Sequence, residues 1–354
     1  MSEEWFKKLI SGDSRNPASS IIRGVLKGCS GVNSLATRLR NLAYDRELQP
    51  VTRQPVPVVA IGNLTVGGTG KTPIVAYVVR ELSALGRRPG IISRGYRADQ
   101  TGTNDEKRVL DLLCPGVPHE QDPDRNAAAA KLLGTGSADV LVLDDAFQHR
   151  RIARQCDIVL IDATNPFGYG HLLPRGLLRE PIHSLRRADV VLITRSDQVD
   201  ESALKRIEAT VSRIRDDLPV HRIRFVPTGL LNATGTTEPL TELAGTTSYL
   251  MTAIGNPEGF RKTCEMQGVN IAGSQFFPDH HHYTREELDQ VVHAARQANA
   301  SRILTTLKDL VKIPADFREF RAVQIETQFP DATAAEMFRN RLNVVVEGFQ
   351  RIET

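Results

Sequence analysis

The chain has 354 residues, of which 40% are hydrophobic and 25% are charged, as in ordinary folded proteins of one or two domains. Its formal net charge of +3 excludes the strongly basic class, so we expect no nucleic-acid partner, and we assign no protein partner. Four scattered cysteines without a Cys-x-x-Cys pair indicate thiols in a reducing compartment. No apolar run reaches the roughly eighteen residues of a membrane span, so we expect no transmembrane helix.

Residues 1–50 combine apolar and basic side chains. The first cluster sets lysines among large apolar residues: Trp5, Phe6, Lys7, Lys8, Leu9 and Ile10. Two interpretations remain open for this segment. It packs on the protein core, or it forms a basic amphipathic segment that lies on an anionic membrane surface.

Residues 56–73 contain the clearest motif. An apolar, β-branched run over 56–61 leads into a glycine-rich turn, and helical spacing of apolar residues follows Lys71. This strand–loop–helix context predicts a phosphate-binding loop, in which Lys71 reaches the terminal phosphates of ATP and the Thr72 hydroxyl group holds Mg²⁺. The strict pattern requires a glycine where Thr65 stands, so the start of the loop is a variant. The predicted ATP-binding residues are Gly67, Gly68, Thr69, Gly70, Lys71 and Thr72.

From residue 56 to about residue 228, apolar runs alternate with helical stretches such as 125–133. The runs cover residues 56–61, 89–93, 140–143, 158–161 and 190–194. Continuous apolarity indicates strands buried on both faces, as in a parallel sheet. We therefore predict an α/β fold with a doubly wound, mainly parallel sheet, and ligand-binding residues at the carboxyl ends of its strands.

Polar residues follow these apolar runs. Asp144 and Asp145 follow the run 140–143, where a carboxylate can hold Mg²⁺ opposite a phosphate loop; a structural cap at the strand end is the alternative. Arg94 follows the run 89–93 in the same way. Residues 165–181 are too rich in glycine and proline for a helix or strand, which is typical of a substrate loop.

Residues 194–197 read Thr-Arg-Ser-Asp and weakly resemble the Asn-Lys-x-Asp base-reading motif of GTPases. A helix N-cap at Ser196 or Asp197 is the other interpretation. This stretch supports the alternative function, a P-loop GTPase-type switch or metallochaperone. A third hypothesis is a non-catalytic, membrane-associated scaffold that binds nucleotide for structural reasons.

A shift in composition over 229–248 predicts the domain boundary. We expect an N-terminal segment at 1–50, a P-loop kinase core at 51–228, and a smaller C-terminal α/β domain at 229–354. The expected C-terminal strands are 249–254, 269–277, 302–306 and 322–326, and the expected helices are 258–267, one opened by a capping box at Thr284, and 334–342. Between them, a histidine beside Asp279 fits proton transfer better than zinc binding.

The motifs together resemble those of the tetraacyldisaccharide 4′-kinases, the lipid A 4′-kinases of Gram-negative bacteria. The resemblance runs from about Pro57 to Asp309. It rests on the variant phosphate loop and on five further motifs: Ser93-Arg94-Gly95-Tyr96, Asp144-Asp145 with Gln148-His149, Leu173-Pro174 through Leu178-Arg179-Glu180, Asp279-His280, and Lys308-Asp309.

The resemblance implies two α/β/α domains with the active site in the cleft between them. It implies ATP- and Mg²⁺-dependent phosphorylation of the 4′-hydroxyl group of an acylated disaccharide 1-phosphate, at the cytoplasmic face of the inner membrane. Asp105 and His280 match a catalytic pair, with Asp105 in Asn-Asp-Glu where the family has Gly-Asp-Glu, and with Glu106 as the alternative carboxylate. Catalysis is assigned to Asp105, His280 and Lys71, and substrate binding to Asn63, Arg94, Gln148, Arg179 and Glu180.

Overall fold

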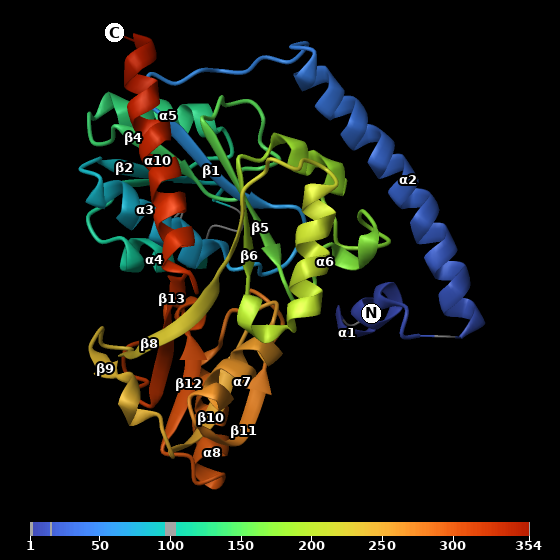
Figure 1. Ribbon diagram of the computed structural model, residues 1–354. Helices are drawn as coiled ribbons and strands as arrows, with labels where there is room; N and C mark the ends of the chain where they lie inside the picture. The colour runs from blue at the N-terminus through green and yellow to red at the C-terminus, as the bar shows by residue number, and fades with distance from the viewer. Residues whose placement is uncertain (1–2, 15, 96–103, 354) are drawn as a thin grey trace. The chain divides into compact units, whose positions relative to one another are not determined.

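The computed structural model describes residues 3–14, 16–95 and 104–353. Its chain divides into two compact units, which are described separately (Figure 1). Unit 1 comprises Met1–Ala98, Cys114–Arg224 and Gln328–Thr354, and unit 2 comprises Asp99–Leu113 and Phe225–Thr327. Three segments therefore differ from the expected domain ranges: residues 1–50 are part of unit 1, residues 99–113 join unit 2, and the C-terminal helix joins unit 1.

Unit 1 is built on a seven-stranded sheet in the order β3-β2-β4-β1-β5-β6-β7, and its neighbouring strands pair in parallel. The strands are β1 (Val58–Asn63), β2 (Pro89–Ser93), β3 (His119–Gln121), β4 (Val140–Leu143), β5 (Cys156–Asp162), β6 (Val190–Thr194) and β7 (Val220–Arg222). Strand order changes direction around β1, so the carboxyl end of β1 is the place where such a sheet binds ligands. The predicted parallel α/β fold is confirmed.

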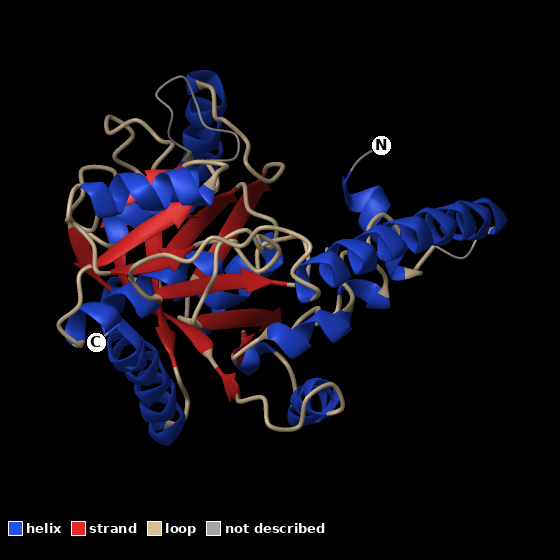
Figure 2. Cartoon of the chain, turned by 90° about the horizontal axis from the view of Figure 1, so that it is seen from above, coloured by secondary structure: helices blue, strands red, loops and turns tan. Residues whose placement is uncertain are grey.

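Helices cover both faces of this sheet, as the red strands and blue helices of Figure 2 show. The α-helices of unit 1 are α1 (Glu3–Ser11), α2 (Pro17–Asp45), α3 (Lys71–Ala84), α5 (Arg125–Gly134), α6 (Glu201–Ser212) and α10 (Ala332–Glu353), and its 3₁₀ turns are η1 (Gly168–Gly170), η2 (Ile182–Arg187) and η3 (Ser196–Gln198). Helix α5 packs into an apolar cluster through Leu132, and α6 packs into another through Leu204 and Ile207. Helix α10 contacts α3, where Arg339 forms an ion pair of 2.6 Å with Glu81.

Unit 2 is a smaller α/β body on a six-stranded sheet in the order β11-β10-β12-β13-β8-β9. The strands are β8 (Arg224–Asn232), β9 (Thr237–Pro239), β10 (Thr247–Thr252), β11 (Asn270–Phe276), β12 (Arg302–Thr306) and β13 (Phe320–Gln328). Its helices are α4 (Asp105–Leu113), α7 (Pro257–Met266), α8 (Arg285–Gln297) and α9 (Leu307–Leu310), with the 3₁₀ turn η4 (Leu240–Glu242). The capping box predicted at Thr284 is confirmed, with Glu287 as its second residue.

Helix α4 explains why residues 99–113 belong to unit 2. Its buried Val109 lies in the apolar cluster that contains Leu288, Phe317 and Phe320 of unit 2, and Leu113 packs against the same cluster. Burial of apolar side chains is the dominant stabilising term of folding. The helix therefore packs on unit 2, where its apolar face is buried, although its neighbours in the sequence belong to unit 1. The catalytic candidate Asp105, at the first turn of α4, is therefore carried by unit 2.

Helix α2 presents its apolar side chains to the outside. Among its most exposed large apolar residues are Ile21, Val25, Val32, Leu35 and Leu39, which are 58–72% exposed. Its buried residues are polar: Ser19, Ser30 and Thr37. The usual orientation of an amphipathic helix on a protein core is thus reversed. Within the described part of the chain, no helix is long and apolar enough to cross a membrane.

The first helix does not share this exposure. Leu9 and Ile10 of α1 are 1% and 0% exposed, whereas Trp5 is 40% exposed. Of the two interpretations of the N-terminal segment, packing on the protein is correct for Leu9 and Ile10, and these two side chains are not available to a membrane surface.

Candidate active site

The phosphate loop of unit 1 has the backbone geometry that anion binding requires. Gly67 and Gly70 have φ angles of 114° and 84°, which side chains other than glycine rarely adopt. Gly67 and Gly68 are exposed, and Gly70 is the N-cap of α3 and supplies no side-chain hydrogen bond to the helix. The first N–H groups of α3 therefore lack a side-chain cap, and together with the helix dipole they attract an anion.

The base of the loop is held by two residues that the sequence analysis assigned to substrate. Asn63 is fully buried; its amide donates to the Thr65 carbonyl group at 2.7 Å, and its oxygen accepts from Lys71 at 3.4 Å. Gln148 donates to the Asn63 carbonyl group at 2.9 Å. These contacts fix the direction in which Lys71 leaves the loop. In this structure both side chains bond to protein groups at the base of the phosphate loop.

Asp145 is the centre of the charges beside the loop. Its carboxylate lies 3.5 Å from the Lys71 ammonium group and accepts two bonds of 2.9 Å from Arg179. Burial alone would raise the pKa of Asp145, but the charges of Lys71 and Arg179 outweigh it and lower that pKa to about 2. Asp145 is thus ionised at neutral pH, and the predicted residues Lys71, Asp145 and Arg179 form one cluster.

Asp144 occupies a different environment from its neighbour. It is 3% exposed, directly after β4, and its N–H group donates to the Ile92 carbonyl group at 2.8 Å. Carboxylate and hydroxyl oxygens such as those of Asp144 and Thr72 are the hard donors that Mg²⁺ prefers, and Mg²⁺ needs only one or two protein ligands beside the phosphates. The donor chemistry at this sheet edge fits a magnesium ion.

The predicted substrate loop, residues 165–181, is tied by its backbone to the segment that enters the phosphate loop. Thr65 and Leu178 form an antiparallel bridge, the N–H group of Val66 donates to Leu177 at 2.8 Å, and that of Arg179 donates to Leu64 at 2.7 Å. This pairing places the Arg179 side chain where it reaches Asp145.

Glu180, assigned to substrate from the sequence, is 0% exposed. Its carboxylate accepts from Arg40 at 2.8 Å and Asn41 at 3.2 Å, both on α2, and from Arg187 at 2.8 Å. Burial alone would raise the pKa of Glu180, but these partners, Arg187 foremost, hold it below the usual range. The carboxylate therefore joins α2 to the loop, and the contacts described for it are with side chains of the protein.

Residues 194–197 contact the phosphate loop through two side chains that the sequence analysis did not select. The Thr194 hydroxyl group donates to the Thr69 carbonyl group at 3.1 Å, and Arg195 donates to the Gly68 carbonyl group at 2.8 Å and pairs with Asp162. The N-cap prediction at Ser196 or Asp197 is wrong, since the cap of α6 is Asp200. The resemblance to a base-reading motif was the signal that could have identified this contact.

Arg94 follows β2 as predicted and is exposed. The Ser93 hydroxyl group before it lies 2.9 Å from His119 and accepts from Gln121 at 3.0 Å, which fixes the end of β2. The motif residue Tyr96 lies outside the described residues.

The second group of candidate residues lies within unit 2. His280 Nδ1 is 3.3 Å from the carboxylate of Asp105, and His280 Nε2 is 3.1 Å from the ammonium group of Lys308. Lys308 also lies 3.4 Å from Asp279, and Lys312 lies 3.8 Å from Asp105. The sequence analysis paired Asp105 with His280 but expected them in different domains; both belong to unit 2. It gave no role to Lys308 or Lys312.

The surroundings keep Asp105 ionised. Its burial favours the neutral acid, but the hydrogen bond with His280 and the charges of Lys312 and Lys308 hold the pKa of Asp105 well below its usual range. Of the two candidate carboxylates, Asp105 is the one that contacts His280.

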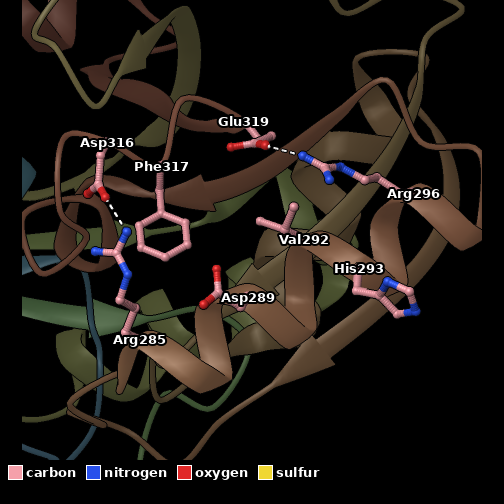
Figure 3. Close-up of a pocket in the computed structure, with 8 residues that line it drawn as sticks. All are labelled: Arg285, Asp289, Val292, His293, Arg296, Asp316, Phe317 and Glu319. Atoms are coloured by element: carbon pink, nitrogen blue, oxygen red, sulfur yellow. Dashed lines mark hydrogen bonds and ion pairs between the residues drawn. The ribbon is translucent and has the colours of Figure 1, made fainter.

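Unit 2 also has a surface hollow of about 360 Å³. Figure 3 shows the residues that line it: Arg285, Asp289, Val292, His293, Arg296, Asp316, Phe317 and Glu319. Arg285 pairs with Asp316, and Arg296 pairs with Glu319 at 2.8 Å. None of the predicted site residues lines this hollow, and its arginines are already paired with carboxylates.

Comparison with known proteins gives a consistent result. The tetraacyldisaccharide-1-P 4′-kinase family matches residues 22–343. The tetraacyldisaccharide 4′-kinase of Anaeromyxobacter sp. strain Fw109-5 is 38% identical over 88% of this chain and 89% of its own length, and that of Anaeromyxobacter sp. strain K is 41% identical over 79% and 78%. The crystal structure of Aquifex aeolicus LpxK in complex with ATP is 26% identical, with a TM-score of 0.73, and covers 92% of this chain and 99% of that one.

Proposed function

Because this chain belongs to the tetraacyldisaccharide-1-P 4′-kinase family, it is a kinase, and we propose that it transfers the γ-phosphoryl group of ATP to the 4′-hydroxyl group of tetraacyldisaccharide 1-phosphate in lipid A biosynthesis. The observation that carries this proposal is the cluster of Lys71, Asp145 and Arg179 beside an open glycine loop at the start of α3.

Phosphoryl transfer depends on positioning and on neutralising the charge of the transferred group. The N–H groups from Gly67 to Thr72 cradle the phosphates of ATP, and Lys71 neutralises their charge. Asp145 keeps Lys71 and Arg179 in place by its ion pairs. Bonds from Thr194 and Arg195 to loop carbonyl groups hold the loop backbone in shape.

Magnesium is assigned to Asp144 and to the hydroxyl group of Thr72, with Asp145 as its charged neighbour. When bound, Mg²⁺ neutralises phosphate charge and orients the transferred group. What the chain itself contributes is a buried carboxylate after β4 and a hydroxyl group in the first turn of α3.

Asp105 handles the proton of the acceptor hydroxyl group. His280 and Lys312 keep its carboxylate ionised, and an ionised carboxylate can accept a hydrogen bond from that hydroxyl group. The transition state of phosphoryl transfer is loose, so the hydroxyl group keeps its proton until late and a weak base is enough. The main contribution of Asp105 is then to orient the oxygen of the acceptor hydroxyl group toward the γ-phosphoryl group.

The decisive experiment incubates the protein with γ-labelled ATP and acylated disaccharide 1-phosphate and follows the label into the lipid phase. We expect transfer by the wild type and none by Lys71→Ala. A panel of nucleotides tests the GTPase alternative, because a GTPase-type switch would hydrolyse GTP selectively and would transfer no label to lipid. Absence of label in the lipid phase would overturn the proposed function.

The reversed orientation of α2 supports a membrane role, at the cytoplasmic face of the inner membrane. The exposed apolar residues of α2 recur three, four or seven residues apart, so they form one stripe along the helix, with Arg23, Lys27 and Arg38 nearby in sequence. Such a helix lies in the plane of an anionic membrane, which is where an acylated substrate is found. The surface we propose is α2, and Leu9 and Ile10 have no part in it.

Sedimentation with vesicles that contain anionic lipid tests this role. Val32→Asp and Leu39→Asp place charges in the stripe and should reduce vesicle binding, whereas Val344→Asp, at a site 62% exposed on α10, is the control. Each basic residue at an anionic surface contributes about 1 kcal/mol, so binding should fall as salt rises. Equal sedimentation of all variants would leave α2 with a packing role only.

A further inference from the structure

We propose that Lys308 is a positioning residue that fixes the ring of His280 in the tautomer with its proton on Nδ1, directed at Asp105. The ammonium group of Lys308 lies 3.1 Å from His280 Nε2, and Asp105 lies 3.3 Å from Nδ1 on the other side of the ring. The three side chains come from α9, the loop before α8, and α4.

Donor and acceptor chemistry leaves one consistent assignment. A lysine ammonium group has three donors and no acceptor, so Nε2 must accept, and an accepting ring nitrogen carries no proton. The neutral ring then has its single proton on Nδ1, which donates to the Asp105 carboxylate. A doubly protonated ring would point its Nε2–H group at the Lys308 cation, so this contact is unfavourable for that form.

Asp279 is a second carboxylate near His280, and Lys308 prevents it from accepting a hydrogen bond from Nε2. The Asp279 carboxylate lies 4.0 Å from His280 Nε2 and 3.4 Å from the Lys308 ammonium group. Without Lys308, a protonated Nε2 would gain Asp279 as an acceptor, and the ring would no longer be restricted to the Nδ1–H tautomer. The charged groups around His280 are thus Asp105, Asp279 and Lys308, with Lys312 behind Asp105.

Helix α9 holds Lys308 firmly enough for this role. Asp309, its neighbour, is 0% exposed and accepts from Thr252 at 2.7 Å, Tyr283 at 2.8 Å and Lys312 at 3.1 Å. Such a saturated buried carboxylate fixes the backbone on which Lys308 stands. The backbone of His280 is also constrained, with φ at +64° and its N–H group donating to Ala253 at 3.2 Å.

The tautomer has a consequence for turnover that rests on the proposed function. With Nδ1–H donating, Asp105 stays an oriented carboxylate that accepts from the acceptor hydroxyl group. A ring with its proton on Nε2 instead would turn an unprotonated Nδ1 toward Asp105, and the carboxylate would lose the donor that orients it. Loss of Lys308 should therefore lower kcat about tenfold or more, while the KM for ATP, which is bound by unit 1, changes less than about twofold.

The test is ¹⁵N-histidine NMR of the full-length protein at neutral pH, with the His280 signals identified by their loss in His280→Gln. We expect the Nδ1–H tautomer in the wild type and in Lys308→Arg, which keeps a donor without an acceptor. In Lys308→Met we expect Nε2 to become protonated. Lys262→Met, an exposed lysine on α7, is the matched control and should leave the spectrum unchanged.

The NMR result is independent of kinase activity. A wild-type ring protonated at Nε2, or a Lys308→Met spectrum identical to the wild type, overturns the role of Lys308 whatever the activity. A shifted tautomer with unchanged kcat instead supports that role and counts against the part given to Asp105 and His280 in the proposed function. If Lys308→Met does not fold, the wild-type spectrum and the Lys308→Arg spectrum still decide the tautomer.

Discussion

The two groups of site residues are held by different kinds of interaction. In unit 1, glycine backbone, a helix start and strand ends supply the phosphate loop, and side chains such as Asn63 and Arg195 bond to its carbonyl groups or to Lys71. In unit 2, side chains alone form the group, and Asp105 is 175 residues from His280 in the sequence. The first arrangement suits the stabilisation of charge, which needs fixed dipoles. The second suits proton handling, which needs a controlled protonation state.

The largest effect should come from the charge of unit 1. Lys71→Ala should lower turnover by roughly 10²–10³-fold or more, because Lys71 stabilises the charge that shifts during transfer. The melting temperature should stay near that of the wild type, since Asp145 keeps Arg179 as an ion-pair partner. Near-normal turnover of Lys71→Ala would show that Lys71 has no catalytic role. It would also contradict the assignment of charge stabilisation to unit 1.

A second effect belongs to unit 2. Asp105→Ala and His280→Ala should each lower kcat by roughly 10²-fold, and the double variant should be little worse than the poorer single one, because residues that act as a unit lose activity non-additively. Glu106→Ala is the matched control and should keep near wild-type activity. Multiplying losses, or a silent Asp105→Ala with an inactive Glu106→Ala, would show that the pair is wrongly assigned.

The neighbouring aspartates should separate by their magnesium dependence. Asp144→Asn should raise the Mg²⁺ concentration for half-maximal rate roughly tenfold, because it removes a charged oxygen donor near the metal. Asp145→Asn should act on the KM for ATP instead, since its carboxylate holds Lys71 and Arg179. If Asp144→Asn keeps the wild-type Mg²⁺ titration, Asp144 serves as a strand-end cap.

The smallest effect concerns stability in acid. The folded pKa of Asp145 is about 2, below its ordinary 3.8, so its ion pairs stabilise the protein above about pH 4 and lose that effect as pH falls toward 2. At neutral pH the contribution is at most about 2 kcal/mol, at 1.36 kcal/mol per unit of pKa. Denaturant unfolding should therefore show Asp145→Asn less stable than the wild type near pH 6, with the difference shrinking toward pH 3. A constant difference would contradict the role of its charge.

Much of unit 1 could be predicted because its information is local. The strands 89–93, 140–143 and 190–194 are confirmed to the residue, since continuous apolar runs report burial on both faces. The glycine loop could be identified because its function depends on consecutive residues.

Contacts between distant segments could not be predicted in this way. The sequence of α4 shows an amphipathic helix but gives no sign that Val109 packs in the core of unit 2. The sequence of α2 likewise does not show that its polar side faces the protein. It also does not show that Arg40 on this side pairs with the buried Glu180. A pattern of apolar residues reports a face of a helix, and only the fold shows what covers that face.

The bond between Glu180 and α2 affects how any shortened version of this enzyme would have to be interpreted. Removing the N-terminal helices deprives a buried carboxylate of Arg40 and Asn41 and leaves it with Arg187 and Ser184 of η2 as side-chain partners. Leucine carbonyl groups at 172 and 173 would lose Ser30 and Asn33 at the same time. The truncation would thus destabilise Glu180 and the loop around it. Loss of activity in a truncated enzyme could then result from a damaged loop as well as from a lost membrane contact. To test the membrane role without damaging the loop, the exposed apolar residues of α2 should be replaced while its buried polar side is kept.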